Sequence, residues 1–396
     1  MGSRFEFWLT DDAGRRLTLL QKIFFASYTR TTLGLGTINL GLSYSSFHQQ
    51  FDPYFKPDWR VEVWRASAES LPMRREDVFL LRKPHVYVRD DNVEILQFYG
   101  RNGIDLLNRR SVIQRPGTSW AEKVGYADDV MKTFVREQML YGSVVDEDGV
   151  SDNTRAFPQN EFLVQSNFSQ GPAITGSYEG KSVFEVLKQI KANTFQLNVN
   201  DSANERVYFD VTPYDVSALS TQFNSDLGWQ FRTFVGLYGT DRTAGMKFSR
   251  ENENIKDPAY STSHLEEVNT MYITEGNQNT IVMVQDAVRA ASSRWNRVED
   301  VVGAGNEPTD TKMENLGYSE IHKKRPLDEL LVTFLNTPGS RTVPRSLYGL
   351  DWDLGDLLPV NFAGKDFNVE INVVYVSIND QGVETITGRN EVNAPS

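Results

Sequence analysis

Alternating hydrophobic and polar residues dominate the first 115 positions of the chain. Phe5, Phe7 and Leu9 alternate with Arg4, Glu6 and Trp8, as in a strand with one buried face. The same period of two recurs at 38–42 and 59–63, and on both sides of a polar turn at 90–92. The pattern predicts at least six short strands, enough for an antiparallel barrel or sandwich.

The period becomes helical after the Pro116-Gly117 pair. A helix is predicted from Ser119 to about Tyr141, with Glu122 completing a capping box with Ser119. A second helix is predicted at 182–192, where Ser182 and Glu185 have the same spacing. Strands are predicted to follow at 194–199 and 206–212.

The remainder of the chain returns to a mainly strand-like pattern. The predicted elements are strands at 231–239 and 269–276, a helix at 285–295, a loop at 303–315, and strands at 357–362, 368–378 and 383–387. Leu327, Leu330, Leu331 and Phe334 predict a short helix after Pro326.

The two ends of the chain echo each other. Residues 86–102 begin Val-Tyr-Val and end Gly-Arg-Asn, and residues 374–390 do the same at identical spacing. Each copy predicts a strand, a polar turn, a second strand and a glycine exit, at Gly100 and at Gly388. Duplication of a β unit and chance identity are both open at this point.

The fold class expected from these patterns is mainly β with an α+β insert. It consists of two related antiparallel β-barrels of the kind that build tubes, plus a helix-containing peripheral domain. The expected division is a first barrel at 1–115, a helix-containing peripheral domain at 116–212, a mixed segment at 213–325 that is part peripheral domain and part second barrel, and a second barrel at 326–396.

The composition of the chain argues against several classes of function. The 396 residues carry a formal net charge of −12, which argues against a basic nucleic-acid footprint and sequence-specific DNA binding. The chain has no cysteine, so disulfides, thiolate metal sites and cysteine nucleophiles are excluded. No apolar run is long enough to span a membrane, and the N-terminus has no secretory signal pattern.

Motifs for catalysis or cofactor binding are missing from the sequence. There is no phosphate-binding loop, no dinucleotide fingerprint and no nucleophile elbow. The four histidines, at 48, 85, 264 and 322, are far apart and favour surface or satisfied interior positions. The acidic stretch at 146–149 lacks the spacing of a calcium loop. We therefore expect no cofactor, no metal and no catalytic residue.

Two weaker chemical interpretations stay open. Asp351, Asp353 and Asp356 are close enough in sequence to supply a carboxylate pair for glycoside hydrolysis, although a turn before a strand explains them better. Aromatic pairs such as Trp59/Trp64 and Phe98/Tyr99 are suited to a carbohydrate-binding module, although core or interface packing is more common. The basic clusters at 109–110 and 323–325 favour solvated or salt-bridged positions.

Several segments together resemble phage tail hub proteins of the siphovirus Gp37-like type. They are FASYTRTTLGLGTINLGLS, DWRVEVWR and VYVRDDNVEILQFYGRNGIDLLNRRSVI near the start, and YGLDWDLGDLLPVNFAGKDFNVEINVVYVSINDQGVETITGRN near the end. In the segment near the end, the Leu-Gly-Asp turn at 354–356 and the Gly-Arg pair at 388–389 resemble the second tube barrel of such hubs. Residues 213–325 resemble them least.

The resemblance implies a structural virion protein without enzymatic activity. It implies a homotrimeric baseplate or tail-tip hub whose six barrels form a pseudo-sixfold ring, adapt the sixfold tail tube to a threefold tip and leave a conduit for DNA ejection. Its partners would be the distal tail, tail tube, tape-measure and tip or fibre proteins. Assembly would take place in the host cytoplasm. An acidic chain suits a conduit whose negative wall repels DNA. Gly100, Gly355 and Gly388 are the residues expected to matter, as structural turns.

Overall fold

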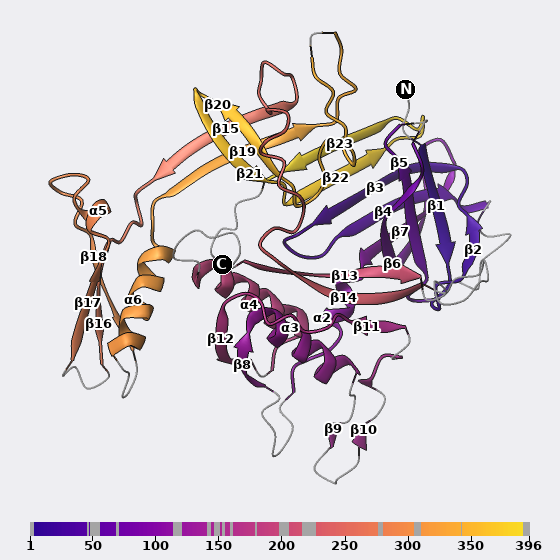
Figure 1. The fold of residues 1–396 in the computed structure, drawn as a ribbon. Helices are drawn as coiled ribbons and strands as arrows, with labels where there is room; N and C mark the ends of the chain where they lie inside the picture. Colours follow the sequence, from indigo (N-terminus) through magenta and orange to yellow (C-terminus); the bar gives the residue numbers. More distant parts are fainter. Residues whose placement is uncertain are drawn as a thin grey trace.

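One large sheet connects the two ends of the chain (Figure 1). The computed structural model describes residues 4–45, 47, 56–68, 71–113, 121–140, 144–145, 151–152, 155–158, 161–178, 180–197, 206–215, 227–275, 280–304, 310–341 and 343–390. Over these residues the protein is mainly β with antiparallel pairing, as the alternating pattern predicted.

The large sheet has eleven strands in the order β15-β19-β23-β22-β3-β4-β7-β6-β5-β1-β2. The first half of the chain supplies β1 (Arg4–Thr10), β2 (Arg16–Leu19), β3 (Ile23–Thr31), β4 (Thr37–Ser43), β5 (Arg60–Ala66), β6 (Arg74–Val88) and β7 (Glu94–Asn102). The second half supplies β15 (Ile255–Ser263), β19 (Leu327–Leu335), β22 (Val373–Ile378) and β23 (Glu384–Arg389). β22 pairs with β3, so strands of the first and last regions of the chain lie in one continuous sheet.

The two halves repeat the same pairing pattern. In the first half, β3 pairs with β4, β4 with β7 and β7 with β6. In the second half, β15 pairs with β19, β19 with β23 and β23 with β22. The start of β6 turns away to pair with β5, just as β21 (Lys365–Glu370), which precedes β22, pairs with β20 (Leu357–Phe362). One hydrophobic core, from Phe7 to Ile386, fills the space inside both halves.

The predicted echo between 86–102 and 374–390 is out of register in the structure. The turn of the first hairpin closes with Arg89 N donating to Val93 O, and the equivalent bond in the second is Asn379 N to Val383 O. The equivalent turns are thus 290 positions apart (379 minus 89), whereas the identical residues are 288 apart (374 minus 86). The hairpins correspond, but the identical side chains do not occupy the same places.

A second lobe, here called the helical lobe, contains most of the helices and has its own core. It contains α2 (Asp105–Asn108), β8 (Glu122–Tyr126), α3 (Ala127–Val135), the π-helical turn η1 (Arg136–Leu140), β9 (Val144–Val145), β10 (Ser151–Asp152), β11 (Phe162–Val164), β12 (Ala173–Ser177), α4 (Val183–Leu197), β13 (Val207–Asp215) and β14 (Leu227–Val235). β13 and β14 pair with each other, so this lobe continues past residue 212 into the segment expected to be of mixed assignment.

A third unit, here called the small domain, occupies residues 264–326 between β15 and β19. Its sheet has the order β17-β16-β18, from β16 (Thr270–Thr274), β17 (Ile281–Gln285) and β18 (Glu299–Gly303). α5 (Ala287–Ala290) lies in a connection, and α6 (Asp310–Lys323) packs on one face of the sheet. Figure 1 shows this domain at the left, with α6 on the side of the main body.

Several sequence-based elements differ from the structure. The short helix predicted after Pro326 is strand β19, because Leu330, Val332 and Phe334 are buried with a period of two. The predicted loop at 303–315 instead contains the start of α6 at Asp310, which places Met313 in the small-domain core. The predicted helix at 285–295 is reduced to α5, with Asp286 accepting a capping hydrogen bond from Arg289 N at 3.0 Å.

The helical predictions in the first half are partly right. α4 begins as predicted, with Glu185 N donating to Ser182 Oγ at 3.2 Å, but it runs to Leu197 over the strand predicted at 194–199. The predicted helix at 119–141 begins only at Ala127, because Glu122 lies in β8. The strand predicted at 368–378 is interrupted at residues 371–372 between β21 and β22.

Candidate assembly site

Eight strands of the large sheet alternate in direction from β15 through to the distal half of β6. One face of these strands covers the core, with Leu40, Phe98 and Val376 among its buried side chains. The opposite face is polar. One cross-strand row on it contains Thr387, Tyr375, Thr29, Thr37 and Arg101, and the next contains Thr385, Ser377, Ser27, Asn39, Tyr99 and Lys83. Neither row contains a carboxylate.

Both ends of this eight-stranded run have an unpaired edge among the described residues. β15 is the terminal strand of the sheet, and its side chains beyond Ile255 are mostly exposed. β5 pairs with β6 only as far as Leu80, so residues 82–88 of β6 have no described partner on their outer side. Pro84 within this segment is typical of an edge strand, because proline cannot complete a ladder. A chain with two open edges of this kind can add a strand of another chain at either end.

A buried ionic network holds the two halves of the sheet together. Arg65 on β5 donates from Nε to Glu384 Oε1 on β23 at 2.6 Å, and its Nη1 donates to the Tyr348 carbonyl at 3.1 Å. Arg74 lies between the carboxylates of Glu76, at 2.9 Å, and Asp353, at 2.8 Å. The contacts of Arg65 with Glu384 and of Arg74 with Asp353 link residues more than 270 positions apart, so the geometry of the first half depends on that of the second.

The acidic cluster at 351–356 takes part in this architecture. Although burial opposes it, the guanidinium groups of Arg30 and Arg74 hold the pKa of Asp353 below its usual value. Asp351 binds Arg345 at 3.0 Å, and Asp356 binds Arg242 at 2.6 Å. Each of the three carboxylates has an arginine partner, so the cluster supports turns and joins between halves. The paired carboxylates considered for glycoside hydrolysis are therefore already engaged.

The three glycines chosen from the sequence have two different surroundings. Gly355 has a φ of 80°, in the left-handed region, and a Cβ there would lie 2.5 Å from Tyr238 Cδ1. Gly100 and Gly388 lie inside β7 and β23 without a positive φ, so they do not form exit turns. They allow close packing instead: a Cβ on Gly100 would meet the Leu80 carbonyl at 2.8 Å, and one on Gly388 the Trp352 ring at 2.7 Å.

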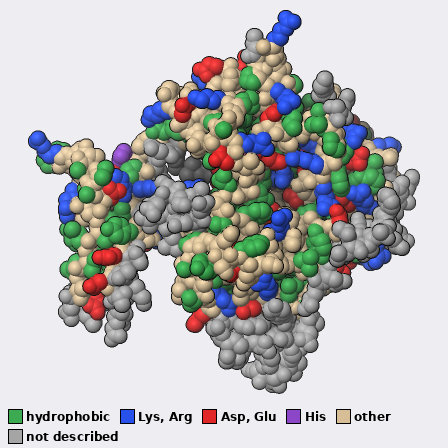
Figure 2. Space-filling view, viewed as in Figure 1, with side chains coloured by type: hydrophobic (Ala, Val, Ile, Leu, Met, Phe, Trp, Pro, Cys, Tyr) green, Lys and Arg blue, Asp and Glu red, His purple; other side chains and the backbone are tan. Residues whose placement is uncertain are grey.

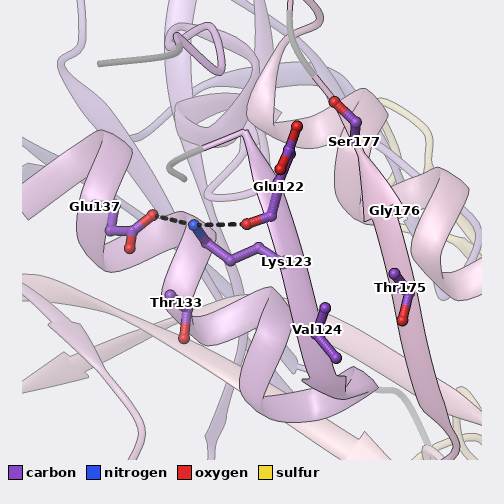
Figure 3. Close-up of a pocket in the computed structure, with 8 residues that line it drawn as sticks. All are labelled: Glu122, Lys123, Val124, Thr133, Glu137, Thr175, Gly176 and Ser177. Atoms are coloured by element: carbon purple, nitrogen blue, oxygen red, sulfur yellow. Dashed lines mark hydrogen bonds and ion pairs between the residues drawn. The ribbon is translucent and has the colours of Figure 1, made fainter. Parts of the chain in front are cut away.

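A cavity of about 690 Å³ lies in the helical lobe between β8, β12 and α3 with η1 (Figure 3). At one wall, Lys123 Nζ lies 3.0 Å from Glu137 Oε2, and Figure 3 shows the two side chains pointing toward each other. Burial raises the pKa of Glu137, and the ion pair with Lys123 opposes the shift. The other lining residues are Glu122, Val124, Thr133, Thr175, Gly176 and Ser177. This cavity is open to solvent, and its one lysine is paired with Glu137.

The remaining candidate residues are dispersed. Trp59 and Phe98 are buried in the core, while Tyr99 is partly exposed. Arg109 binds Asp105 and Lys323 binds Glu320, so both basic clusters contain a salt-bridged residue, as the sequence favoured. His264 Nδ1 lies 2.8 Å from Glu267, and His85 stacks on Tyr87. His48 and the acidic stretch at 146–149 lie outside the described residues, and nothing is described of the His322 side chain.

Within the described parts of the chain, no group of His, Asp and Glu is arranged to hold a metal ion. In the same parts, no helix has the length and apolar character needed to span a membrane.

Comparison with solved structures identifies the class of fold. The chain is similar to a 43 kDa tail protein of prophage MuSo2 from Shewanella oneidensis, with a TM-score of 0.53, 13% identity and 98% of each chain covered. It is similar to a tail protein from Neisseria meningitidis MC58, with a TM-score of 0.51, 10% identity and coverage of 99% of this chain and 97% of that one.

A structure of the lidless PdpA–VgrG complex also matches, with a TM-score of 0.51, 9% identity and coverage of 100% of this chain and 67% of that one. No protein-family model and no curated protein sequence matches the chain. At these identities the comparisons show the fold, and the fold is that of phage tail proteins.

Proposed function

We propose that this chain is a structural protein of a phage tail and forms the homotrimeric hub at the tail tip or baseplate. The observation that carries the proposal is the run of eight alternating strands that ends in two unpaired edges, β15 and residues 82–88 of β6. Because the two edges differ, their pairing between copies is heterologous, and such contacts close into a ring when the rotation from copy to copy adds up to a full turn.

Strand directions agree with closure. β15 and β7 run in the same direction, because an even number of antiparallel pairings separates them. β6 runs opposite to both, so a neighbouring copy's β15 can pair antiparallel with residues 82–88. Three copies then form a barrel of 24 strands (3 × 8), and their six similar halves match a sixfold tube at one end and a threefold tip at the other.

In this ring, the polar face of the eight strands would line the conduit for DNA ejection, because the other face covers the core. Its rows are rich in hydroxyl and amide groups, with Arg101 and Lys83 as charged members. This composition differs from the acidic wall expected from the net charge. A wall with few charges binds phosphate weakly, which also suits passage of DNA.

The distal tail, tail tube, tape-measure and tip or fibre proteins are the proposed partners, and the virion is the proposed location. The decisive experiment is the mass of the purified protein in solution by light scattering, followed by negative-stain imaging. A particle of about 135 kDa, three times the 45.0 kDa chain, with a central hole is the expected result. A species that stays at the mass of one chain at all concentrations, with or without tail partners, would contradict the hub.

A further inference from the structure

The small domain has an exposed sheet face that carries apolar side chains together with Arg297, which donates to Tyr272 Oη at 3.1 Å and lies 3.9 Å from Met283 Sδ. α6 covers only one side of its three strands, where Gly317 allows the helix to approach Ile273 and Val284. On the other side, Tyr272 is paired in register with Met283 on β17 and with Val301 on β18. Met283 is 51% exposed and Val301 61% exposed. An exposed sheet face with large apolar side chains, on a two-layer domain, is typical of an interaction surface.

This outer face points away from the rest of its own chain. α6 lies against α4 of the helical lobe, so the helix separates the three-stranded sheet from the body, as Figure 1 shows. Figure 2 shows hydrophobic side chains on the small domain at the left of the view, with a basic side chain at its upper tip. A partner for this face must therefore come from another molecule.

The point at which the small domain leaves the large sheet indicates which molecule supplies this partner. The domain leaves from the end of β15, and the helical lobe leaves from the end of β7. These strands run in the same direction, so both units rise from the same end of the eight-stranded run. Within one chain, five strands separate β15 from β7. In the proposed ring, only β6 separates the β7 of one copy from the β15 of its neighbour.

We propose that the outer face of the small domain docks on the helical lobe of the neighbouring copy of this chain; this inference rests on the proposed ring. Interface area supports it. Pairing along seven residues of one edge supplies main-chain hydrogen bonds but only part of the roughly 1,200–2,000 Å² that stable interfaces bury. The apolar face provides a second contact at the same junction. The helical lobe offers exposed apolar side chains of its own, among them Val124 and Tyr126 on β8.

The absence of native cysteine gives a direct test. A Met283→Cys variant carries a single thiol that accepts a photoreactive benzophenone label. In an equal mixture of isotopically light and heavy copies, cross-links between light and heavy chains identify contacts between copies. Links from position 283 to the helical lobe of another copy are expected. A Val383→Cys variant is the control, because Val383 is exposed in the β22–β23 turn, at the opposite end of the strands. It is not expected to link to that lobe.

A second measurement separates this contact from the ring itself. Met283→Asp is expected to raise the dissociation constant of the assembly at least tenfold, and Val383→Asp is expected to leave it unchanged. A ring that forms normally with Met283→Asp, without links between copies from position 283, would overturn the docking contact and leave the hub intact. A wild-type protein that never assembles, with no links between copies, would overturn both.

Discussion

Arg65 and Glu384, which are 319 positions apart in the sequence, form a two-pronged ion pair between the halves of the sheet. Arg65 Nε lies 2.6 Å from Glu384 Oε1, and Nη2 lies 3.2 Å from Oε2. The Arg65 side chain is fully buried and also lies 3.8 Å from Glu76. A paired geometry of this type fixes orientation as well as distance. The pair therefore sets how β23 of the second half lies relative to β5 of the first.

Replacing Arg65 by methionine should destabilise the protein strongly. The change keeps an unbranched apolar stem but removes the guanidinium and leaves Glu384 and Glu76 buried without this partner, a loss of about 3–5 kcal/mol in comparable cases. Urea unfolding followed by tryptophan fluorescence measures the effect. Arg345→Met is the matched control, because Arg345 pairs with Asp351 at an exposed position where the loss is below about 1 kcal/mol. Equal effects of the two changes would contradict a structural role for the buried pair.

Gly355→Val should disrupt the second half of the sheet and the assembly of the ring. The residue combines a φ of 80° with no space for a side chain, since a Cβ would lie 2.5 Å from Tyr238 and 2.8 Å from Gly239 N. Gly364→Val is the control, because Gly364 has a φ of 74° but no atom within 4 Å of an added Cβ. The control should lose only the backbone term of about 1–2 kcal/mol. Gel filtration and thermal unfolding distinguish the two, and unchanged assembly of Gly355→Val would count against the prediction.

Asp77 on β6 should make stability depend on pH between about 4 and 7. Burial beside Asp210 of β13 raises the pKa of Asp77 to about 7, against the opposing effect of Arg30. Because the pKa is higher in the folded state, the folded protein binds more protons in this window, and stability falls as the pH rises through it.

Asp77→Asn removes this titration. The variant should be more stable than the wild type at pH 8, with a difference that shrinks as the pH falls through 7 toward 4. Urea midpoints of the two proteins across this range test the sign. A wild-type advantage that grows with pH would show that the carboxylate is stabilised in its charged form.

Val86→Asp should weaken assembly without unfolding the chain. Val86 lies on the unpaired segment of β6, and its side chain is 48% exposed. A charge at a strand edge discourages pairing with a further strand. Sedimentation velocity over a range of concentrations should show a shift toward the single-chain species, with Val383→Asp unchanged. Normal assembly of Val86→Asp would argue against this edge as a subunit joint.

Local patterns in the sequence predicted the mainly β class because side-chain alternation is visible within a single strand. The hairpins at each end of the chain and the cap at Ser182 were likewise predictable, since each depends on a few adjacent residues. β19 was misread because Leu327, Leu330, Leu331 and Phe334 fit a helical spacing, while its buried residues are Leu330, Val332 and Phe334. Short apolar runs do not separate the two periods.

The joint between β22 and β3 and the pair of Arg65 with Glu384 could not be predicted, because neither partner carries a local signal for the other. The echo between the hairpins misled for a different reason. A shift of two residues keeps every side chain on its own face of the sheet, so the hydrophobic pattern fits both alignments. Only the hydrogen bonds of the two turns reveal which residues are equivalent.

The connection between β15 and β19 has a consequence for how such a chain can change over time. In the first half, the equivalent strands β3 and β4 are joined by residues 32–36, whereas in the second half residues 264–326 fill the same gap. Ser263 and Leu327 remain direct partners in the β15–β19 ladder, so the inserted residues do not alter the pairing of the two strands. The connection between these two strands is therefore a position at which a whole domain can be inserted, lost or exchanged during evolution without a change in the large sheet.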